Sequence, residues 1–463
     1  DVLEAPKENL RAADAEVGQP DGLFNGLPRK SLFDSIRVNR AERVASPLWA
    51  DPKTSHIFLY AKAVLADVVH YLTASSVALL HPVDSYIAMY AVIHEHWHIE
   101  DLLMTLQMMA VAIPEQSPQT LTFPMIVTES SVCATRAPVS SSFASTSSSS
   151  SSSSSLRVVA VSPPPPPPIT TAVATARLPS WISVPASTYL LGASKTDPFV
   201  FGQEKWGHKC EVSAFQIARY PVTNEEFMQF IDDGGYENRL LWSIEGWRWK
   251  TENDVASPLY WEKRDSGGQW QVRRFEQWIP VCPGLATHPV AHVSYWEAEA
   301  YCEWCGGGAR LPTEAEWEVA ATWPPVKGHE GQRRYPWGSD FFMGGAAEGG
   351  ASSLVYRANL GHRVQSTHGT VPVAAFGQKG ESALGLSQLV GNVWEWTRTT
   401  FYPFPGYQMD FPYRENAAPW FGFSKVAKGG AWSTSEYLAH SKHRNFYDAG
   451  GRREVVIGFR VVR

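Results

Sequence analysis

A run of serine followed by a run of proline divides this chain and limits what it can fold into. Serine dominates the sequence from Ser140 to Ser155, and prolines fill Pro163–Pro168. Such segments offer few apolar side chains to bury, so they stay extended instead of joining a core. The chain has 463 residues, which is also long for one core. We therefore expect a helical domain over residues 1–125, a Ser/Pro-rich linker over 126–180 and a second domain over 181–463.

The charge and the cysteine content narrow the class of protein. There are 40 Lys and Arg against 46 Asp and Glu, a net charge of -6, so no polybasic surface for nucleic acid or anionic lipid is expected. Neither an apolar run long enough to span a bilayer nor a signal peptide is visible. The 5 cysteines are odd in number and scattered, which favours a reducing compartment. These features favour a cytoplasmic protein that acts on small molecules, with neither nucleic acid nor a membrane as partner.

The N-terminal domain is predicted to be a bundle of helices. Apolar residues recur at helical spacing between about Ile57 and Met109, with few Gly or Pro. One helix carries "VIHEHWHIEDLL", in which His94 and His98 are four residues apart. Both imidazoles therefore leave the same face of the helix and can reach one metal ion, whereas His96 points elsewhere.

Two acidic residues follow this histidine pair. Asp101 falls on the same face of the helix and could act as a further ligand. Glu100 is displaced from that face and is better placed to orient a ligand imidazole. Two other interpretations remain open. His94–His98 also fits the zinc-peptidase pattern HExxH, although the linker and second domain that follow argue against a peptidase. The histidines could also be ordinary surface residues.

The second domain differs from the first in amino-acid composition and patterning. Short alternating apolar segments, many Gly and Pro residues and frequent Trp predict small strands and long loops with one or two helices. One helix should begin after Ser294 as N-cap and end before Gly306–Gly308. Another should start, capped, within Arg310–Trp317. Trp394 and Trp396 are expected to be buried, each with a partner for its indole N–H.

Seven ordered segments of this domain are specific in combination. They read "FQIARYPVTNEEFMQF", "HPVAHVSYWEAEAYCEW", "RLPTEAEWEVAA", "YPWG", "GNVWEWT", "KGGAWS" and "GFRVVR". Together they resemble the formylglycine-generating-enzyme domain (sulfatase-modifying factor), whose fold is related to C-type lectins and has little regular structure. The resemblance implies a multidomain protein, α in its first part and α+β in its second. Fold alone does not give function.

The cysteines of the formylglycine-generating enzymes have no counterpart here. Those enzymes use a cysteine pair just past the segment that matches "GGAWS", because thiolates hold their copper. In this chain that stretch is Ser433–Tyr437, and no cysteine follows Cys305. We therefore do not expect that activity. Cys302 and Cys305 lack a second CxxC and are expected to be core thiols.

The two domains together resemble another family. A helical domain similar to the DinB family, bearing His-x3-His-x-Glu and joined to a formylglycine-generating-enzyme-like domain, is the architecture of the ergothioneine and ovothiol sulfoxide synthases. His94, His98 and Glu100 match that motif. The resemblance implies an oxidoreductase with non-heme Fe(II) that uses O2. Its substrates would be a thiol, cysteine or γ-glutamylcysteine, and histidine or trimethylhistidine.

One ligand of that family has no evident counterpart. In the family a third histidine, from an earlier helix, completes the Fe(II) site, and it lies upstream of the segment matching Leu32–Pro47. No histidine precedes that segment here, and His56, His70 and His81 fall in the wrong place. Three explanations stay open. The helix precedes Asp1, so the first domain is truncated; or Asp101 is recruited; or this member does not hold iron.

The resemblance also implies residues that contact the substrates. Arg40 and Arg43 are carried over for the carboxylates of the thiol donor, which guanidinium groups bind bidentately. A solvated basic face is the alternative for this pair. Near the C-terminus, Asn445 and Phe446 are carried over for the amino-acid end of the other substrate, with Tyr447 lining the same pocket.

A tyrosine shortly after the "GNVWEWT" match donates a proton in related enzymes. Tyr402 is the nearest candidate for this catalytic role, although Phe401 or Phe404 could hold the aligned position. A phenylalanine there would remove the acid and favour thiol dioxygenation. The alternative to an enzyme is a non-catalytic homologue whose lectin-like domain binds a ligand or a partner protein.

Overall fold

The computed structural model describes residues 82–110, 180–195, 197, 199–264, 268–325, 333–338, 357–361, 369–410 and 416–463. Contacts divide the chain into two compact units, Asp1–Ala88 and Met89–Arg463. Helix α5 (Pro82–Met108) begins in the first unit and continues in the second. It confirms one helix of the predicted bundle. The remainder of that bundle, and the predicted linker up to residue 179, lie outside the described residues.

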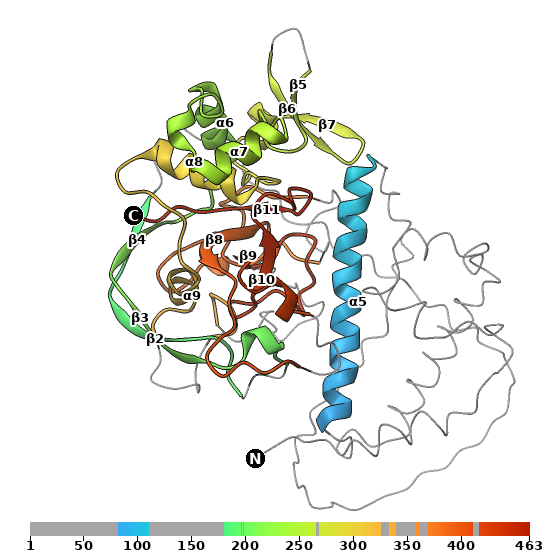
Figure 1. The fold of residues 1–463 in the computed structure, drawn as a ribbon, viewed down its shortest axis with the longest axis vertical. Helices are drawn as coiled ribbons and strands as arrows, with labels where there is room; N and C mark the ends of the chain where they lie inside the picture. The colour runs from blue at the N-terminus through green and yellow to red at the C-terminus, as the bar shows by residue number, and fades with distance from the viewer. Residues whose placement is uncertain are drawn as a thin grey trace, which may run out of the picture. The chain divides into compact units, whose positions relative to one another are not determined.

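A four-stranded sheet lies at the centre of the second unit (Figure 1). Its strands run in the order β10-β9-β8-β11. Their bounds are β8 Trp394–Thr400, β9 Ser424–Lys428, β10 Asn445–Asp448 and β11 Ile457–Gly458. All neighbours pair antiparallel except β11, which runs parallel to β8. The longest described strand, β8, has 7 residues, so the expectation of short strands between long loops is confirmed.

Besides α5 and some 3-10 turns, the described residues of this unit form three smaller sheets and four further α-helices, which is more than the one or two helices expected. The pairs are β1 (Trp181–Val184) with β4 (Phe215–Ala218) and β2 (Ser187–Leu191) with β3 (His208–Val212); the meander is β5 (Trp261–Lys263), β6 (Trp270–Arg274) and β7 (Gln277–Pro280). The helices are α6 (Asn224–Asp232), α7 (Ile244–Glu252), α8 (Tyr295–Cys305) and α9 (Glu314–Thr322). Figure 1 shows α6, α7 and α8 together beyond one end of the central sheet, beside the meander.

The helix starts follow from local side-chain chemistry. Ser294 caps α8 because its hydroxyl accepts a hydrogen bond from the Glu297 N–H, and the Glu297 carboxylate accepts one from the Ser294 N–H. Thr313 and Glu316 form the same reciprocal pair at the start of α9. Each pair satisfies two backbone donors that a helix leaves without partners. The predicted starts of both helices are confirmed, and Gly306 ends α8 with φ of 64°.

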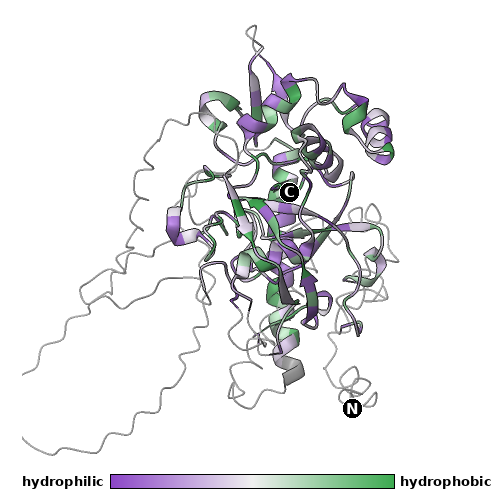
Figure 2. Cartoon of the chain, turned by 90° about the vertical axis from the view of Figure 1, so that its left-hand side faces the viewer, coloured by the Kyte–Doolittle hydropathy of each residue, from purple (hydrophilic) through white to green (hydrophobic). Residues whose placement is uncertain are grey.

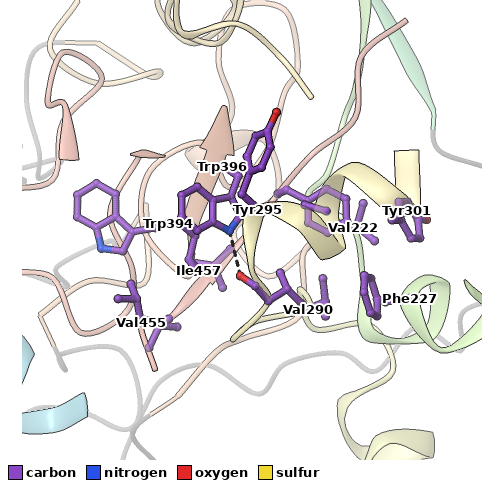
Figure 3. Packing of buried hydrophobic residues seen from close by; sticks show 14 of the residues in the cluster. Val222, Phe227, Val290, Tyr295, Tyr301, Trp394, Trp396, Val455 and Ile457 are labelled. Carbon is purple, nitrogen blue, oxygen red and sulfur yellow. Dashed lines mark hydrogen bonds between the residues drawn. The ribbon is translucent and has the colours of Figure 1, made fainter. Parts of the chain in front are cut away.

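Aromatic side chains fill the main core. Trp394 and Trp396 lie side by side near Tyr295 and Ile457 (Figure 3). The indole N–H of Trp394 donates to Glu100 Oε1 at 3.0 Å, and that of Trp396 donates to the Val293 carbonyl at 3.0 Å. Both predicted indole partners are therefore confirmed. Because each polar atom is satisfied, the rings are buried without the cost of an unpaired donor.

Apolar and polar residues alternate along the described elements and do not form long apolar blocks (Figure 2). Among the described residues, no helix combines the length and apolar character that crossing a bilayer requires.

Candidate functional site

From Met89 onward, helix α5 packs within the second unit through buried residues spaced three, four or seven apart. Ile93, Glu100, Met104 and Gln107 are buried, and Met104 belongs to the main core. Near the end of the helix, Gln107 accepts a hydrogen bond from the Phe275 N–H at 2.5 Å. This spacing places these residues on one face of the helix. The helix is therefore held along most of its length from Met89 onward.

Glu100 is the central anchor of this contact. Its Oε1 accepts hydrogen bonds from Trp394 Nε1, from Ser433 Oγ at 3.1 Å and from Thr434 Oγ1 at 2.8 Å. Burial raises the pKa of this carboxyl group, and the three donors oppose that rise. These three partners of Glu100 lie on the second domain, and they fix the helix that carries the histidines.

We expect Glu100→Ala to loosen α5 selectively. Removing the carboxylate leaves three buried donors without their acceptor, which costs about 1–3 kcal/mol for each unsatisfied group. Hydrogen exchange of residues 89–108 should rise well before that of the central sheet. Glu95→Ala is the matched control, because Glu95 is exposed on the same helix. Unchanged exchange in the Glu100 variant would contradict this anchoring role.

The two predicted metal ligands lie beside each other. The rings of His94 and His98 are 4.5 Å apart between centroids and nearly perpendicular, while His96 contacts Tyr437 instead. The two rings are therefore in contact, as a pair of ligands to one ion would need to be. Burial and the neighbouring His98 lower the pKa of His94, which keeps it in the neutral form that ligands require.

The described residues also contain a second group with potential ligands. Among them, Glu204, His440 and His443 form the one cluster of three or more acidic, histidine or cysteine side chains whose ligand atoms lie within 4.8 Å. His94 and His98 have no such third partner in the described part of the chain. All three residues of the second cluster are buried. Two imidazoles and a carboxylate are a common ligand set for non-heme iron.

Hydrogen bonds already engage several ligand atoms of this cluster. His443 Nδ1 and Glu204 Oε1 are 2.5 Å apart, and the Lys442 N–H donates to His440 Nδ1 at 3.2 Å. Burial, with nearby cationic groups, lowers the pKa of His440 well below its usual range, so the ring is neutral. Without a metal, its proton is then on Nε2. We interpret the cluster as a hydrogen-bonded carboxylate–imidazole pair, with His443 Nε2 unpartnered among the described residues.

Strand β10 places two carried-over residues on one face. Asn445 Nδ2 donates to the Tyr447 hydroxyl at 2.7 Å, because alternate strand residues point the same way. Phe446 lies on the opposite face and stacks on Phe401 with centroids 4.1 Å apart. Asp101 of α5 lies 3.9 Å from Arg452, whose guanidinium is 5.7 Å from the Tyr447 ring. The flank of α5 bearing Asp101 thus approaches Tyr447.

The remaining residues singled out in the sequence lie elsewhere in the second domain or outside the described residues. Tyr402 is 59% exposed, whereas Phe401 and Phe404 are buried in apolar surroundings. Arg40 and Arg43 lie outside the described residues. Cys302 is buried as expected, but Cys305 is exposed, because it is the last residue of α8 and reaches the surface. Burial raises the pKa of the Cys302 thiol. Although Cys305 as a residue is exposed, its sulfur lies against Tyr301 and is partly desolvated, which raises its pKa to about 11, so neither thiol forms a thiolate readily.

Sequence reasoning missed the Glu204, His440 and His443 cluster. The spacing of His440 and His443 immediately before the Arg444-Asn445 segment was a usable signal, since short histidine spacings suggest shared sites. Glu204 gave none, because it lies 239 residues from His443 along the chain.

The chain matches one family model and is similar to several known proteins. The family model described as "Sulfatase-modifying factor enzyme 1-like domain" matches residues 168–463. Hercynine oxygenase of Mycobacterium tuberculosis is 38% identical over 276 residues, which cover 59% of this chain and 58% of that protein. Formylglycine-generating enzyme of Thermomonospora curvata is 30% identical over 294 residues, covering 58% and 86%. Inactive C-alpha-formylglycine-generating enzyme 2 of Mus musculus is 33% identical over 246 residues, covering 49% and 71%.

The chain therefore spans a little under two thirds of the length of the hercynine oxygenases it matches, with 58%, 60% and 56% of three such proteins covered.

Proposed function

Because this chain belongs to the sulfatase-modifying factor enzyme 1-like domain family, we propose that it uses this domain to oxidise small molecules with O2. The proposed reaction joins the sulfur of cysteine or γ-glutamylcysteine to an imidazole carbon of histidine or trimethylhistidine. The S–H and the C–H bonds break and an S–C bond forms. One oxygen atom of O2 becomes the sulfoxide oxygen, and the other leaves as water with the two hydrogens.

The observation that carries this proposal is the identity of 38% with a hercynine oxygenase, against 30% with a formylglycine-generating enzyme. Hercynine is a histidine derivative, so the likeness favours an imidazole substrate. The sequence Ser433–Tyr437, at the place of the cysteine pair, supports the same choice.

Each proposed role belongs to a residue with suitable chemistry. His94 and His98 would hold Fe(II), which supplies the electrons and the binding position that O2 needs to react. Asn445 and Tyr447 would orient the amino-acid end of the imidazole substrate. The Tyr447 oxygen accepts from Asn445, so its own hydrogen stays available for a substrate acceptor. Arg40 and Arg43 are proposed for the thiol donor's carboxylates, and Asp101 for a further ligand position.

The test is a product assay with labelled oxygen. The full chain, supplied with Fe(II), cysteine or γ-glutamylcysteine, and histidine or trimethylhistidine, should consume O2. Mass spectrometry of a reaction under 18O2 should show one labelled oxygen in a coupled sulfoxide. Omitting the imidazole substrate is the control. Oxygen uptake without a coupled product would contradict the proposed reaction.

We expect Tyr402→Phe to change the product. If Tyr402 delivers a proton during sulfoxide formation, its loss slows that step by about 10²-fold, the lower end for general acid catalysis. The thiol should then take up both oxygen atoms of O2 as a sulfinic acid. The measurement is the ratio of sulfoxide to sulfinic acid. Tyr407→Phe is the matched control, since Tyr407 packs on Phe421 in the same loop. An unchanged ratio would remove Tyr402 from the reaction.

A non-catalytic binding protein is the second candidate. It is favoured by the 33% identity with a relative named inactive, and by the two-histidine set of α5. The two candidates differ in metal content. A binding module has no use for stoichiometric iron, so purified full chain that neither retains iron nor consumes O2 would support this alternative.

A further inference from the structure

Two consecutive arginines end strand β6 with opposite surroundings. The guanidinium of Arg273 is held by backbone acceptors, because its Nη1 donates to the carbonyls of Gln107 at 2.8 Å and Phe275 at 3.2 Å. Its neighbour Arg274 points to the other face of the strand, as alternate strand residues do. Among the described residues, Arg274 donates one hydrogen bond, from Nη2 to Thr370 Oγ1 at 3.3 Å. Most of its donors are therefore left for another acceptor.

No acid neutralises Arg274 within the described part of the chain. Ion pairs there involve other arginines, and Glu454, the one carboxylate in the wall of the adjoining cavity, pairs with Arg452 at 2.5 Å. Burial alone lowers the pKa of Arg274 to about 10, with no opposing acid. Burial, and to a smaller extent the charge of Arg274, lowers the pKa of His288 to about 4, so this imidazole is neutral. His288 Nδ1 lies 3.1 Å from Thr370 Oγ1. The surroundings carry an uncompensated positive charge.

The local structure leaves room for the guanidinium and for a ligand. A Cβ atom on Gly369 would fall 2.4 Å from Arg274 Cζ, so only glycine lets the group lie against this backbone. Arg274 and Thr370 also line a cavity of about 50 Å³, whose apolar walls include Trp261 and Trp432. That volume exceeds the 10–15 Å³ or so that one water needs. An apolar pocket with one convergent charge is a usual form of a ligand site.

We propose that this cavity is a binding site for a small carboxylate, with Arg274 as its charged partner and Thr370 as a second contact. A guanidinium matches the planar carboxylate with two parallel hydrogen bonds. The volume suits a carboxylate group with one or two carbons, either as a free acid or as the acid end of a larger molecule. Neither His94 nor His98 lines this cavity, and acetate binding can be measured without turnover.

The test uses acetate as probe, with acetamide as its neutral isostere at equal ionic strength. By calorimetry on the full chain, acetate should bind saturably and acetamide should not. Arg274→Ala should weaken acetate binding at least tenfold. Gly369→Ala should act similarly, because its Cβ displaces the guanidinium. Arg264→Ala is the matched control, since Arg264 lies at the end of β5 in the same sheet, with its charge over the Trp278 ring, and it should bind acetate normally.

Three results would overturn the proposal. Acetate could bind the Arg274 variant as tightly as the parent chain, acetamide could bind as well as acetate, or inorganic phosphate could bind more tightly than acetate. The last result would point to a tetrahedral oxyanion. If Arg274→Ala does not fold, Thr370→Val serves as the second test variant, because it removes one contact at nearly constant volume. It should weaken acetate binding measurably.

Discussion

Replacing His98 with alanine is expected to lower Fe(II) affinity at least about a hundredfold and to abolish coupled O2 consumption. Loss of a residue that merely orients a metal ligand already costs 10–100-fold in affinity or activity, so loss of a ligand costs more. His94→Ala should behave the same way, because the two rings lie together at 4.5 Å. The measurement is Fe(II) titration under nitrogen, followed by oxygen uptake with both substrates.

His96→Ala supplies the matched control. His96 lies on the same helix, between the two proposed ligands, but its ring contacts Tyr437. This variant should bind iron like the parent chain. Equal iron loss in the His96 and His98 variants would mean that helix stability, and not ligation, explains the effect.

His443→Ala separates the two groups of potential ligands. We interpret His443 as the partner of Glu204 in a buried hydrogen-bonded pair, so its loss should lower stability and leave the Fe(II) stoichiometry unchanged. If the His443 variant loses iron and the His98 variant keeps it, the metal centre is the Glu204, His440 and His443 cluster. That outcome would refute the assignment to α5.

Features fixed by neighbouring residues were predictable from the sequence. The caps at Ser294 and Thr313 depend on a side chain and a backbone N–H three residues away. The His94 and His98 pair depends on helix geometry, which places residues four apart on the same face. In each case the interacting groups are held together by one local conformation, so the sequence pattern alone defines the geometry.

Features that join distant segments were not predictable in the same way. Glu100 was expected to orient a ligand imidazole, but its hydrogen bonds are with Trp394, Ser433 and Thr434, the first of them 294 residues away. Phe446 was carried over with Asn445, yet the strand geometry of β10 turns it to the opposite face. Contacts of the first kind depend on how loops of the second domain meet α5, which no local pattern encodes.

A buried cluster of charges should contribute strongly to the stability of the second domain. Glu318 of α9 accepts hydrogen bonds from Lys428 Nζ at 2.9 Å and Lys442 Nζ at 2.8 Å. Lys442 also donates to the Tyr189 hydroxyl at 2.6 Å. The carboxylate of Glu318 and the ammonium of Lys428 are fully buried. The cluster joins α9, β9 and β2, so its loss affects several elements together.

Glu318→Gln is expected to lower the free energy of unfolding by about 3–5 kcal/mol. Removing one partner of a buried ion pair leaves the other charge uncompensated in the interior. Here Lys442 loses its carboxylate partner, while Lys428 keeps only Glu314 at 3.8 Å. Urea denaturation at neutral pH measures the change. Glu303→Gln on the exposed face of α8 is the control and should stay within about 0.5 kcal/mol of the parent chain.

The same pair of variants should show a defined pH dependence. Burial alone would raise the pKa of Glu318, but Lys428 and Lys442 lower it to about 2 from an ordinary value of 4.5. The folded pKa is thus below the unfolded one, so the stabilisation is complete above pH 4.5 and is lost as the pH falls toward 2. Each pKa unit corresponds to 1.36 kcal/mol, so lowering the pKa of Glu318 from 4.5 to about 2 stabilises the folded state by about 3 kcal/mol. This value agrees with the roughly 3–5 kcal/mol expected for Glu318→Gln. The gap in unfolding free energy between the parent chain and Glu318→Gln should therefore narrow across this range. A gap that stays constant from pH 7 to pH 3 would show that Glu318 stabilises the fold by packing and not by its charge.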